Sequence, residues 1–201
     1  MHFMSVRVRH RVWEIMLTMI VLSVAWLVQL NVLSKLSFSS VLCNLPLTMT
    51  IIWGTVFGSP LPPLPARELA ASSISQVFAY QSLKGSISGA LIGAAFAALF
   101  STVTPAYMIA YPIIGWIAGY FTLKSFNQAT LFCIPLVFAF TVFGETITAI
   151  QLLVGGRPDV FERLVQVAPP EAVLNSLVAP FIYFPMRGWY EFARVRDLNQ
   201  E

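Results

Sequence analysis

Charged residues are scarce in this sequence. Asp, Glu, Lys and Arg together make up 10% of the 201 residues, whereas hydrophobic residues make up 57%. A soluble domain needs a wetted surface and typically contains about 25% charged residues, so the composition excludes an ordinary soluble protein. The sequence therefore predicts a polytopic membrane protein with no separate soluble domain.

Residues that commonly carry chemistry are also few. Both histidines precede the first apolar run, and the two cysteines lie in different apolar runs. Serine-type intramembrane proteolysis needs a base beside the nucleophile; the aspartyl type needs two aspartates in the membrane, but Asp159 and Asp197 fall outside the apolar runs. No clustered metal ligands and no GxxxxGK[ST] phosphate loop occur. We therefore expect a non-enzymatic protein without catalytic residues, metal or cofactor.

Six apolar runs are long enough to cross a membrane, which takes about 20 mainly apolar residues. They cover residues 12–33, 38–57, 85–101, 106–123, 129–154 and 172–186. We expect an all-α fold in which residues 1–201 form a single integral membrane domain. That domain is predicted to be a compact bundle of six transmembrane helices.

Positive charges are distributed unevenly between the segments that join these runs. With a cytoplasmic N-terminus, nine of the twelve Lys and Arg residues face the cytoplasm and three face the outside, which follows the positive-inside rule. The nine are Arg7, Arg9, Arg11, Arg67, Lys84, Lys124, Arg187, Arg194 and Arg196; the three are Lys35, Arg157 and Arg163. Six spans then place both termini in the cytoplasm. The N-terminal arginines indicate orientation, so no nucleic-acid partner is expected.

Two connecting segments are amphipathic. Residues 59–83, on the predicted cytoplasmic side, begin with SPLPPLP, which cannot continue a helix, and go on as either an interfacial helix or an extension of the third span. Residues 157–168, on the outer side, predict a short helix with Asp159 as N-cap and Glu162 three residues later. The Pro169–Pro170 pair is predicted to end it. Its apolar edge is a possible partner surface, made of Phe161, Leu164 and Val165.

Small residues line one face of the third run. Gly85, Gly89 and Gly93 recur every fourth residue, and Ala97 continues the row. Residues four apart stack on one face of a helix, and in lipid such a face lets two backbones approach closely. The row serves either packing within the chain or an interface with another protein. A small-residue face on the fourth run can receive it; that face holds Gly115 and Gly119.

Polar residues inside the apolar runs are candidate functional positions. Glu145 is the one acid well inside a run, and an ionisable group there is a functional hypothesis by default. The alternative is a neutral glutamate that locks one helix to another. Asn175 lies in the last run. The amides of Gln29 and Asn31 end the first run, where they face either the bundle interior or the lipid headgroups.

Five stretches, taken in order, carry a resemblance to a known family. They are NLPLTMTIIWG (44–54), KGSISGALIGAAFAAL (84–99), YPIIGWIAGYF (111–121), ETITAIQLL (145–153) and VAPPEAVLNSLVAPFIYFPMR (167–187). Over about residues 12–189 the chain resembles MreD, the small polytopic subunit of the bacterial rod-shape machinery, or elongasome, and most of all its cyanobacterial members. The order of the stretches matters more than any one of them.

The resemblance implies a membrane scaffold in the bacterial inner membrane. MreD-like proteins are expected to bind MreC, a single-span protein, and through it the actin-like MreB, the glycosyltransferase RodA and a class B penicillin-binding protein. The assembly directs lateral peptidoglycan synthesis and cell shape. These partners, like the surrounding membrane lipid, are expectations from the resemblance.

The chain departs from the family pattern in two places, and the six-helix architecture of the family suggests a second possible function. Many members carry an acid near the outer end of the third span, where this chain reads LFSTVTP, and the 59–83 insert is longer than expected.

MreD also resembles the substrate-capture subunits of energy-coupling-factor transporters in its six-helix architecture. A capture subunit for a vitamin or metal should have an outward pocket lined by polar and aromatic groups, whereas a scaffold should co-purify with a single-span partner.

Overall fold

Helices make up nearly all of the described part of the chain. The structure, a computed structural model, describes residues 17–21, 23–31, 37–38, 41–58, 87–100, 107–121, 132–157 and 160–198. For these residues the predicted all-α fold is confirmed. The 59–83 segment and Gly85 lie outside the described residues.

The elements follow one another with one short ribbon near the start. In chain order they are the N-terminal helical segment (residues 17–21 and 23–31), β1 (Ser37–Phe38), β2 (Val41–Leu42), α2 (Leu45–Phe57), α5 (Ile87–Phe100), α6 (Tyr107–Ala118), the 3-10 helix η2 (Gly119–Phe121), α7 (Cys133–Val154) and α8 (Val160–Leu198). β1 and β2 pair antiparallel, with Ser37 opposite Leu42 and Phe38 opposite Val41. The ribbon leads directly into α2.

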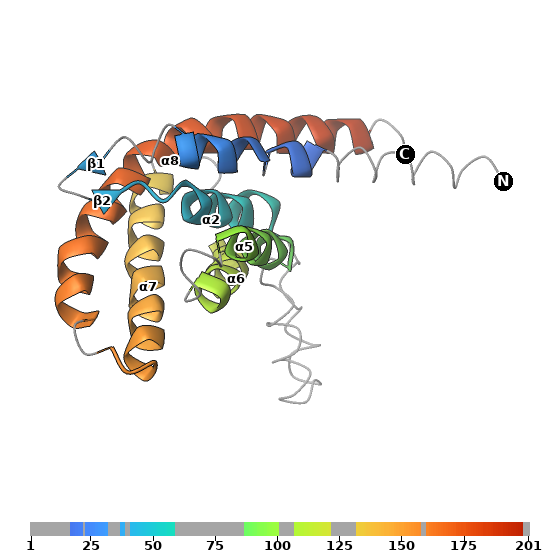
Figure 1. Cartoon of the computed structure of the whole chain (residues 1–201). Coiled ribbons are helices and arrows are strands. Elements are labelled where there is room, and N and C mark those ends of the chain that lie inside the picture. Colours follow the sequence, from blue (N-terminus) through green and yellow to red (C-terminus); the bar gives the residue numbers. More distant parts are fainter. Residues whose placement is uncertain are drawn as a thin grey trace, which may run out of the picture.

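α2 is the central helix of the bundle. Every residue from Leu45 to Val56 is buried, and α5, α6, α7 and α8 all contact it (Figure 1). A helix that is hydrophobic all round is a buried one. At its start, the Asn44 side chain accepts a hydrogen bond from the Leu47 backbone N–H at 3.2 Å. Pro46 occupies the first turn, where its missing N–H leaves no helical bond unmade.

Glycines bring α2, α5 and α6 together backbone to backbone. A Cβ atom added to Gly54 of α2 would lie 2.5 Å from the carbonyl oxygen of Gly115 in α6. A Cβ added to Gly89 of α5 would meet that same oxygen and would lie 2.8 Å from the Gly54 Cα. One turn along, a Cβ on Gly93 would lie 2.5 Å from the Tyr111 carbonyl oxygen. None of these three positions has room for a side chain.

α7 and α8 form a long antiparallel pair. Gly155 caps α7 and Gly156 follows at φ 82°, a left-handed conformation that favours glycine. The first part of α8 then returns alongside α7, and its last part lies across the top of the bundle beside the N-terminal helical segment (Figure 1). Pro180 lies between the part that bonds to α7 and the part that packs on α2. A proline is the usual cause of such a change in helix direction.

α8 also continues where the sequence predicts an end. It runs without interruption through Pro169 and Pro170, so the amphipathic segment from Val160 onward and the last apolar run are one helix. An interior proline costs a helix about 3 kcal/mol. Burial on both sides of the pair offsets this cost: Val160 and Ala168 are buried before the prolines, and Ala172 is fully buried after them.

Two of the described helices are long and apolar enough to cross a membrane, judged by length and composition. They are α7 and residues Val160–Glu191 of α8. The N-terminal helical segment, α2, α5, and α6 together with η2 are apolar but have only 10–17 residues each. By length and composition, α7 and α8 are thus the two described helices that could cross a membrane.

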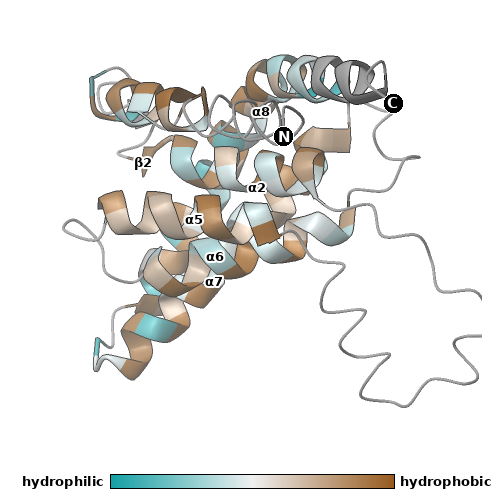
Figure 2. Ribbon diagram, turned by 90° about the vertical axis from the view of Figure 1, so that its right-hand side faces the viewer, coloured by the Kyte–Doolittle hydropathy of each residue, from teal (hydrophilic) through white to brown (hydrophobic). Residues whose placement is uncertain are grey.

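The outer surface of the bundle is apolar as well as its core. Hydrophobic residues are spread over all the labelled helices in Figure 2. Among the largest exposures of hydrophobic side chains are Val154 at 84%, Phe181 at 80% and Leu91 at 66%. Exposed hydrophobic side chains of this size are consistent with a surface in contact with lipid.

An aromatic cluster joins the end of α2 to the last part of α8. Trp53 lies 5.6 Å from Trp189, and Phe57 lies 5.3 Å from Trp189 and 5.8 Å from Tyr190, measured between ring centroids; all three pairs meet edge to face. Such pairs contribute about 0.5–1.5 kcal/mol each beyond the area they bury. The cluster fixes α8 on α2 at the opposite end of α2 from Asn44.

The close backbone contact at Gly89 predicts that even a methyl side chain at this position destabilises the fold. Gly89→Ala should lower the free energy of unfolding by about 1–3 kcal/mol, because its methyl group meets backbone that cannot move aside. Gly188→Ala is the matched control: it also lies within a helix, but no atom lies within 4 Å of its added Cβ. Gly188→Ala should therefore raise the free energy of unfolding by the helix-propensity difference alone, roughly 0.5–1 kcal/mol. Thermal unfolding in detergent of the two variants measures the difference; equal stabilities would contradict the close approach.

Candidate functional site

The described polar side chains gather where α2 begins. Asn44 is the centre of this polar junction, which we define as Gln29, Asn44, Tyr111, Thr141 and Asn175. Besides capping α2, the Asn44 Oδ1 accepts a hydrogen bond from the Tyr111 hydroxyl of α6 at 2.8 Å. The Asn44 backbone N–H donates to Asn175 Oδ1 of α8 at 2.7 Å. One residue therefore links the start of α2 to two other helices.

Asn175 uses both ends of its amide. Its Oδ1 accepts from the Asn44 N–H and, at 3.3 Å, from the Cys43 thiol, while its Nδ2 donates to Thr141 Oγ1 of α7 at 3.3 Å. The side chain is fully buried. A buried amide costs free energy unless it is hydrogen-bonded, and here α7 and the segment before α2 supply the partners. Asn175 therefore fixes three segments in one register.

Gln29 attaches the N-terminal helical segment to the same place. Its Nε2 donates to the Cys43 carbonyl at 2.9 Å, and its Oε1 accepts from the Leu45 N–H at 2.9 Å. The Leu45 N–H is in the first turn of α2 and has no partner within the helix. Asn31, by contrast, is exposed and, within the part of the chain that the structure describes, donates to the Leu27 carbonyl of its own helix. Of the two amides at this end, Gln29 faces the bundle.

Two carboxyl groups lie on the same side of the bundle. Glu145 on α7 and Glu171 on α8 both lie near Tyr111 of α6. Glu145 is one helical turn from Thr141, and Glu171 is one turn from Asn175, which is the residue that Thr141 bonds. Glu171 is 5% exposed and Glu145 is half-buried. The sequence analysis singled out Glu145 but not Glu171, because Glu171 falls at the predicted start of a span.

Further along this face of α7 two polar atoms are buried. Thr148 Oγ1 and Gln151 Oε1 have no hydrogen-bond partner within the part of the chain that the structure describes. Thr148 is two turns from Thr141 and therefore shares its face. The polar face of α7 thus extends beyond the junction itself.

The predicted small-residue faces meet inside the chain. Gly89 and Gly93 pack against the α6 backbone at Gly115 and Tyr111 respectively. Ala97 and Gly119 are buried, and Gly85 lies outside the described residues. Gly54 of α2 completes the contact, and the sequence analysis missed it because a lone glycine has no spacing pattern. For the described residues of the small-residue row, the contacts are therefore packing contacts within the chain.

The possible partner surface is exposed at the start of α8. Phe161 is 64% exposed and Val165 73% exposed, while Leu164 is half-buried. Beside them Glu162 and Gln166 form an exposed side-chain hydrogen bond of 3.1 Å. The apolar pair therefore stands free of the bundle on the first turns of α8.

This arrangement holds helices in place. The junction consists of amides and hydroxyls bonded to one another, to the Cys43 thiol or to backbone, and it contains no nucleophile–base pair. Among the described residues no group of three or more His, Cys, Asp or Glu is placed to hold a metal ion. These hydrogen bonds fix the distances between the helices that they join.

Comparison of the chain with family models, with curated proteins and with solved structures found no significant match.

The junction generates a prediction for its central amide. Asn175→Leu keeps a similar volume but leaves the Asn44 N–H and the Thr141 hydroxyl without this partner, so the free energy of unfolding should fall by about 1–3 kcal/mol. Asn31→Leu is the control, since Asn31 is exposed and, among the described residues, bonds its own helix; it should change stability by less than about 0.5 kcal/mol. Thermal unfolding of both variants in the same detergent compares them. Similar losses in the two variants would rule out the structural role of the junction.

Proposed function

We propose that the chain is a polytopic protein of the bacterial inner membrane with six transmembrane helices and both termini in the cytoplasm. The apolar exterior supports a lipid environment: besides Phe161 and Val165, large hydrophobic side chains are exposed on the N-terminal helical segment, α5, α6, α7 and α8. The six proposed spans are those of the apolar runs. Four of them correspond to the shorter helices and include flanking residues outside the described ranges.

Within this membrane we propose an MreD-like scaffold that holds an MreC-like single-span protein. Through that partner it would connect MreB, RodA and a class B penicillin-binding protein, and so direct lateral peptidoglycan synthesis. The proposal is non-enzymatic. It treats the bundle as a fixed platform whose buried polar groups hold its own helices and whose surface receives the partner.

One observation carries the proposal: the stretches that resemble MreD supply most of the residues that hold the bundle together, although Gln29 and Thr141 lie outside them. Asn44 and Gly54 come from the first stretch, Gly89 from the second and Gly115 from the third. Asn175, which bonds the Asn44 N–H, comes from the last. A resemblance made of unrelated apolar runs would have no reason to coincide with the interhelical contacts.

In the proposed topology the start of α8 lies at the outer end of the α7–α8 pair, where a partner's periplasmic region can reach it. Phe161 and Val165 are its exposed apolar side chains. In water, burying such a side chain contributes about 1.5–3 kcal/mol, enough for a specific contact. We therefore assign this surface to the single-span partner.

Conditional depletion together with affinity purification tests the proposed function. Depletion in a rod-shaped host should produce round cells, and the purified chain should carry a single-span protein with it. The double variant Phe161→Ser, Val165→Ser should reduce that protein in the eluate by about tenfold or more.

The control uses the polar pair on the same two turns. Glu162→Ser, Gln166→Ser removes an exposed hydrogen bond and should leave co-purification unchanged. Rod-shaped cells after depletion would overturn the scaffold proposal. Tight binding of a vitamin or metal by the purified chain would support the substrate-capture alternative instead.

A further inference from the structure

Three buried side-chain oxygens lie on α7 and the first part of α8. They are Thr148 Oγ1 and Gln151 Oε1 of α7 and Glu171 Oε1 of α8. The Thr148 side chain is 6% exposed and Glu171 5% exposed. Within the part of the chain that the structure describes, the Thr148 and Gln151 oxygens have no hydrogen-bond partner. A buried oxygen without a partner costs free energy, so a ligand that the chain itself does not supply is expected here.

The antiparallel register of α7 and α8 places these residues opposite one another. The bond between Thr141 and Asn175 fixes one point of contact between the two helices. Thr148 lies two turns beyond Thr141 on the same face of α7. Glu171 lies one turn before Asn175, which is the same direction along the pair because α8 runs the opposite way. Thr148 and Glu171 therefore both lie between the helices, on the same side of the Asn175 bond.

The lean of helical side chains brings the oxygens closer together. Side chains on a helix point back toward the N-terminus of that helix. Gln151 therefore leans over the turn that contains Thr148. Glu171 leans toward the start of α8, which is also toward the level of Thr148. By the same rule Glu145 leans away, toward Thr141, so the oxygens converge around Thr148 with one carboxylate among them.

The chemistry of these oxygens selects a cation. An amide oxygen and a carboxylate only accept, and a hydroxyl has accepting lone pairs. Oxygen ligands of this kind suit hard cations. One carboxylate and two neutral oxygens balance a single positive charge. A carboxylate also has about four lone-pair sites, so Glu171 can bind an ion alongside its other contacts.

The space around the oxygens favours a bare ion over a water molecule. Each of the three oxygens is closed to a sphere of the size of water. A water oxygen lies about 2.8 Å from the oxygen that it bonds, whereas a hard cation such as Ca²⁺ lies at about 2.3–2.6 Å from its oxygen ligands. Sodium is close to calcium in size and carries one charge. A smaller adjustment of the side chains therefore admits sodium than admits water.

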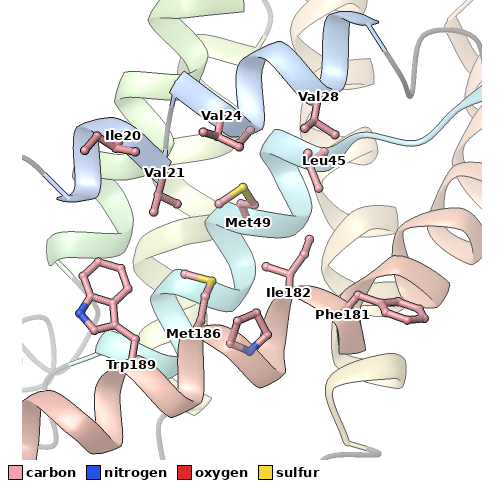
Figure 3. Close-up of a pocket in the computed structure, with 12 residues that line it drawn as sticks. Ile20, Val21, Val24, Val28, Leu45, Met49, Phe181, Ile182, Met186 and Trp189 are labelled. Carbon is pink, nitrogen blue, oxygen red and sulfur yellow. The ribbon is translucent and has the colours of Figure 1, made fainter.

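The apolar groove on the other part of α8 offers no such ligands. It lies between the N-terminal helical segment, α2 and α8, and Figure 3 shows apolar side chains such as Met49, Ile182 and Met186 along it. None of its lining side chains carries an oxygen. The oxygens that suit a cation are those around Thr148.

We propose that Thr148, Gln151 and Glu171 bind one sodium ion between α7 and α8. The ion supplies the partner that the Thr148 and Gln151 oxygens lack and balances the charge of the Glu171 carboxylate. It ties the first part of α8 to the end of α7, beyond the Asn175 bond. The site goes beyond the scaffold role proposed above, because its residues are distinct from the exposed Phe161 and Val165.

Thermal unfolding of the full chain in detergent tests the site. The chain is unfolded in sodium, potassium or choline chloride at equal ionic strength. An ion that binds only the folded state stabilises it by mass action. The unfolding midpoint should therefore rise by about 3–5 °C for each tenfold increase of sodium above its Kd, relative to choline. Potassium is a larger ion and should give a smaller shift.

Two substitutions at Thr148 locate the ion. Thr148→Val keeps the shape of the side chain but removes Oγ1, so it should abolish most of the sodium shift while the midpoint in choline stays close to that of the unaltered chain. Thr148→Ser keeps the hydroxyl and should keep the shift. Thr146→Val is the matched control on the same helix, because Thr146 Oγ1 donates to the Val142 carbonyl; its sodium shift should be unchanged.

Four results would overturn the proposal. Equal midpoints in sodium and choline would show that no ion binds and would leave a water molecule or a protonated Glu171 as the partner. A sodium shift that survives Thr148→Val would place the ion elsewhere. An equal shift in potassium, or a shift with calcium chloride but not with sodium, would contradict the size or the charge assigned to the ion. Co-purification of a single-span protein is measured separately, so failure of the sodium site is distinguishable from failure of the scaffold role.

Discussion

The amide of Asn175 is the interaction on which the arrangement of the bundle depends most. It joins Cys43 and Asn44, more than 130 residues away in the sequence, to α8, and through Thr141 it joins both to α7. In lipid a hydrophobic driving force between helices is missing, so specific polar contacts and close packing set which faces meet. Gln29 and Tyr111 extend the same junction to the N-terminal helical segment and to α6.

Close backbone approach sets the rest of the packing. Gly54, Gly89 and Gly115 leave three helices in contact without intervening side chains, which gives the dispersion contacts that small residues allow in a membrane. The junction and the glycine contact are complementary, because one fixes register through directional bonds and the other fixes distance through shape. Together they leave the large apolar side chains outside, where lipid covers them in the proposed location.

Part of this arrangement was predictable from the sequence. Glycines spaced four apart on one run and a small-residue face on the next predict which helix faces can meet, because helix geometry is local. Gly54 and Tyr111 carry no such periodic signal. The helix end predicted at Pro169 and Pro170 was wrong, because α8 continues through both prolines. Burial of Ala168 and Ala172 offsets the local cost of the prolines. The bonds of Asn175 depend on which run lies beside which, and that is not encoded in any local pattern.

The proposed scaffold role depends on rigidity, so the direct test is whether the junction exists in the membrane. Cys43 already lies 3.3 Å from the Asn175 side chain, and Asn175→Cys in a Cys133→Ala background provides a second thiol at that place. Mild oxidation in intact membranes should close a disulfide within the chain, which mass spectrometry of the linked peptides detects. Two thiols that stay separately alkylated after oxidation would show that the start of α2 and the middle of α8 do not meet, and would contradict the account.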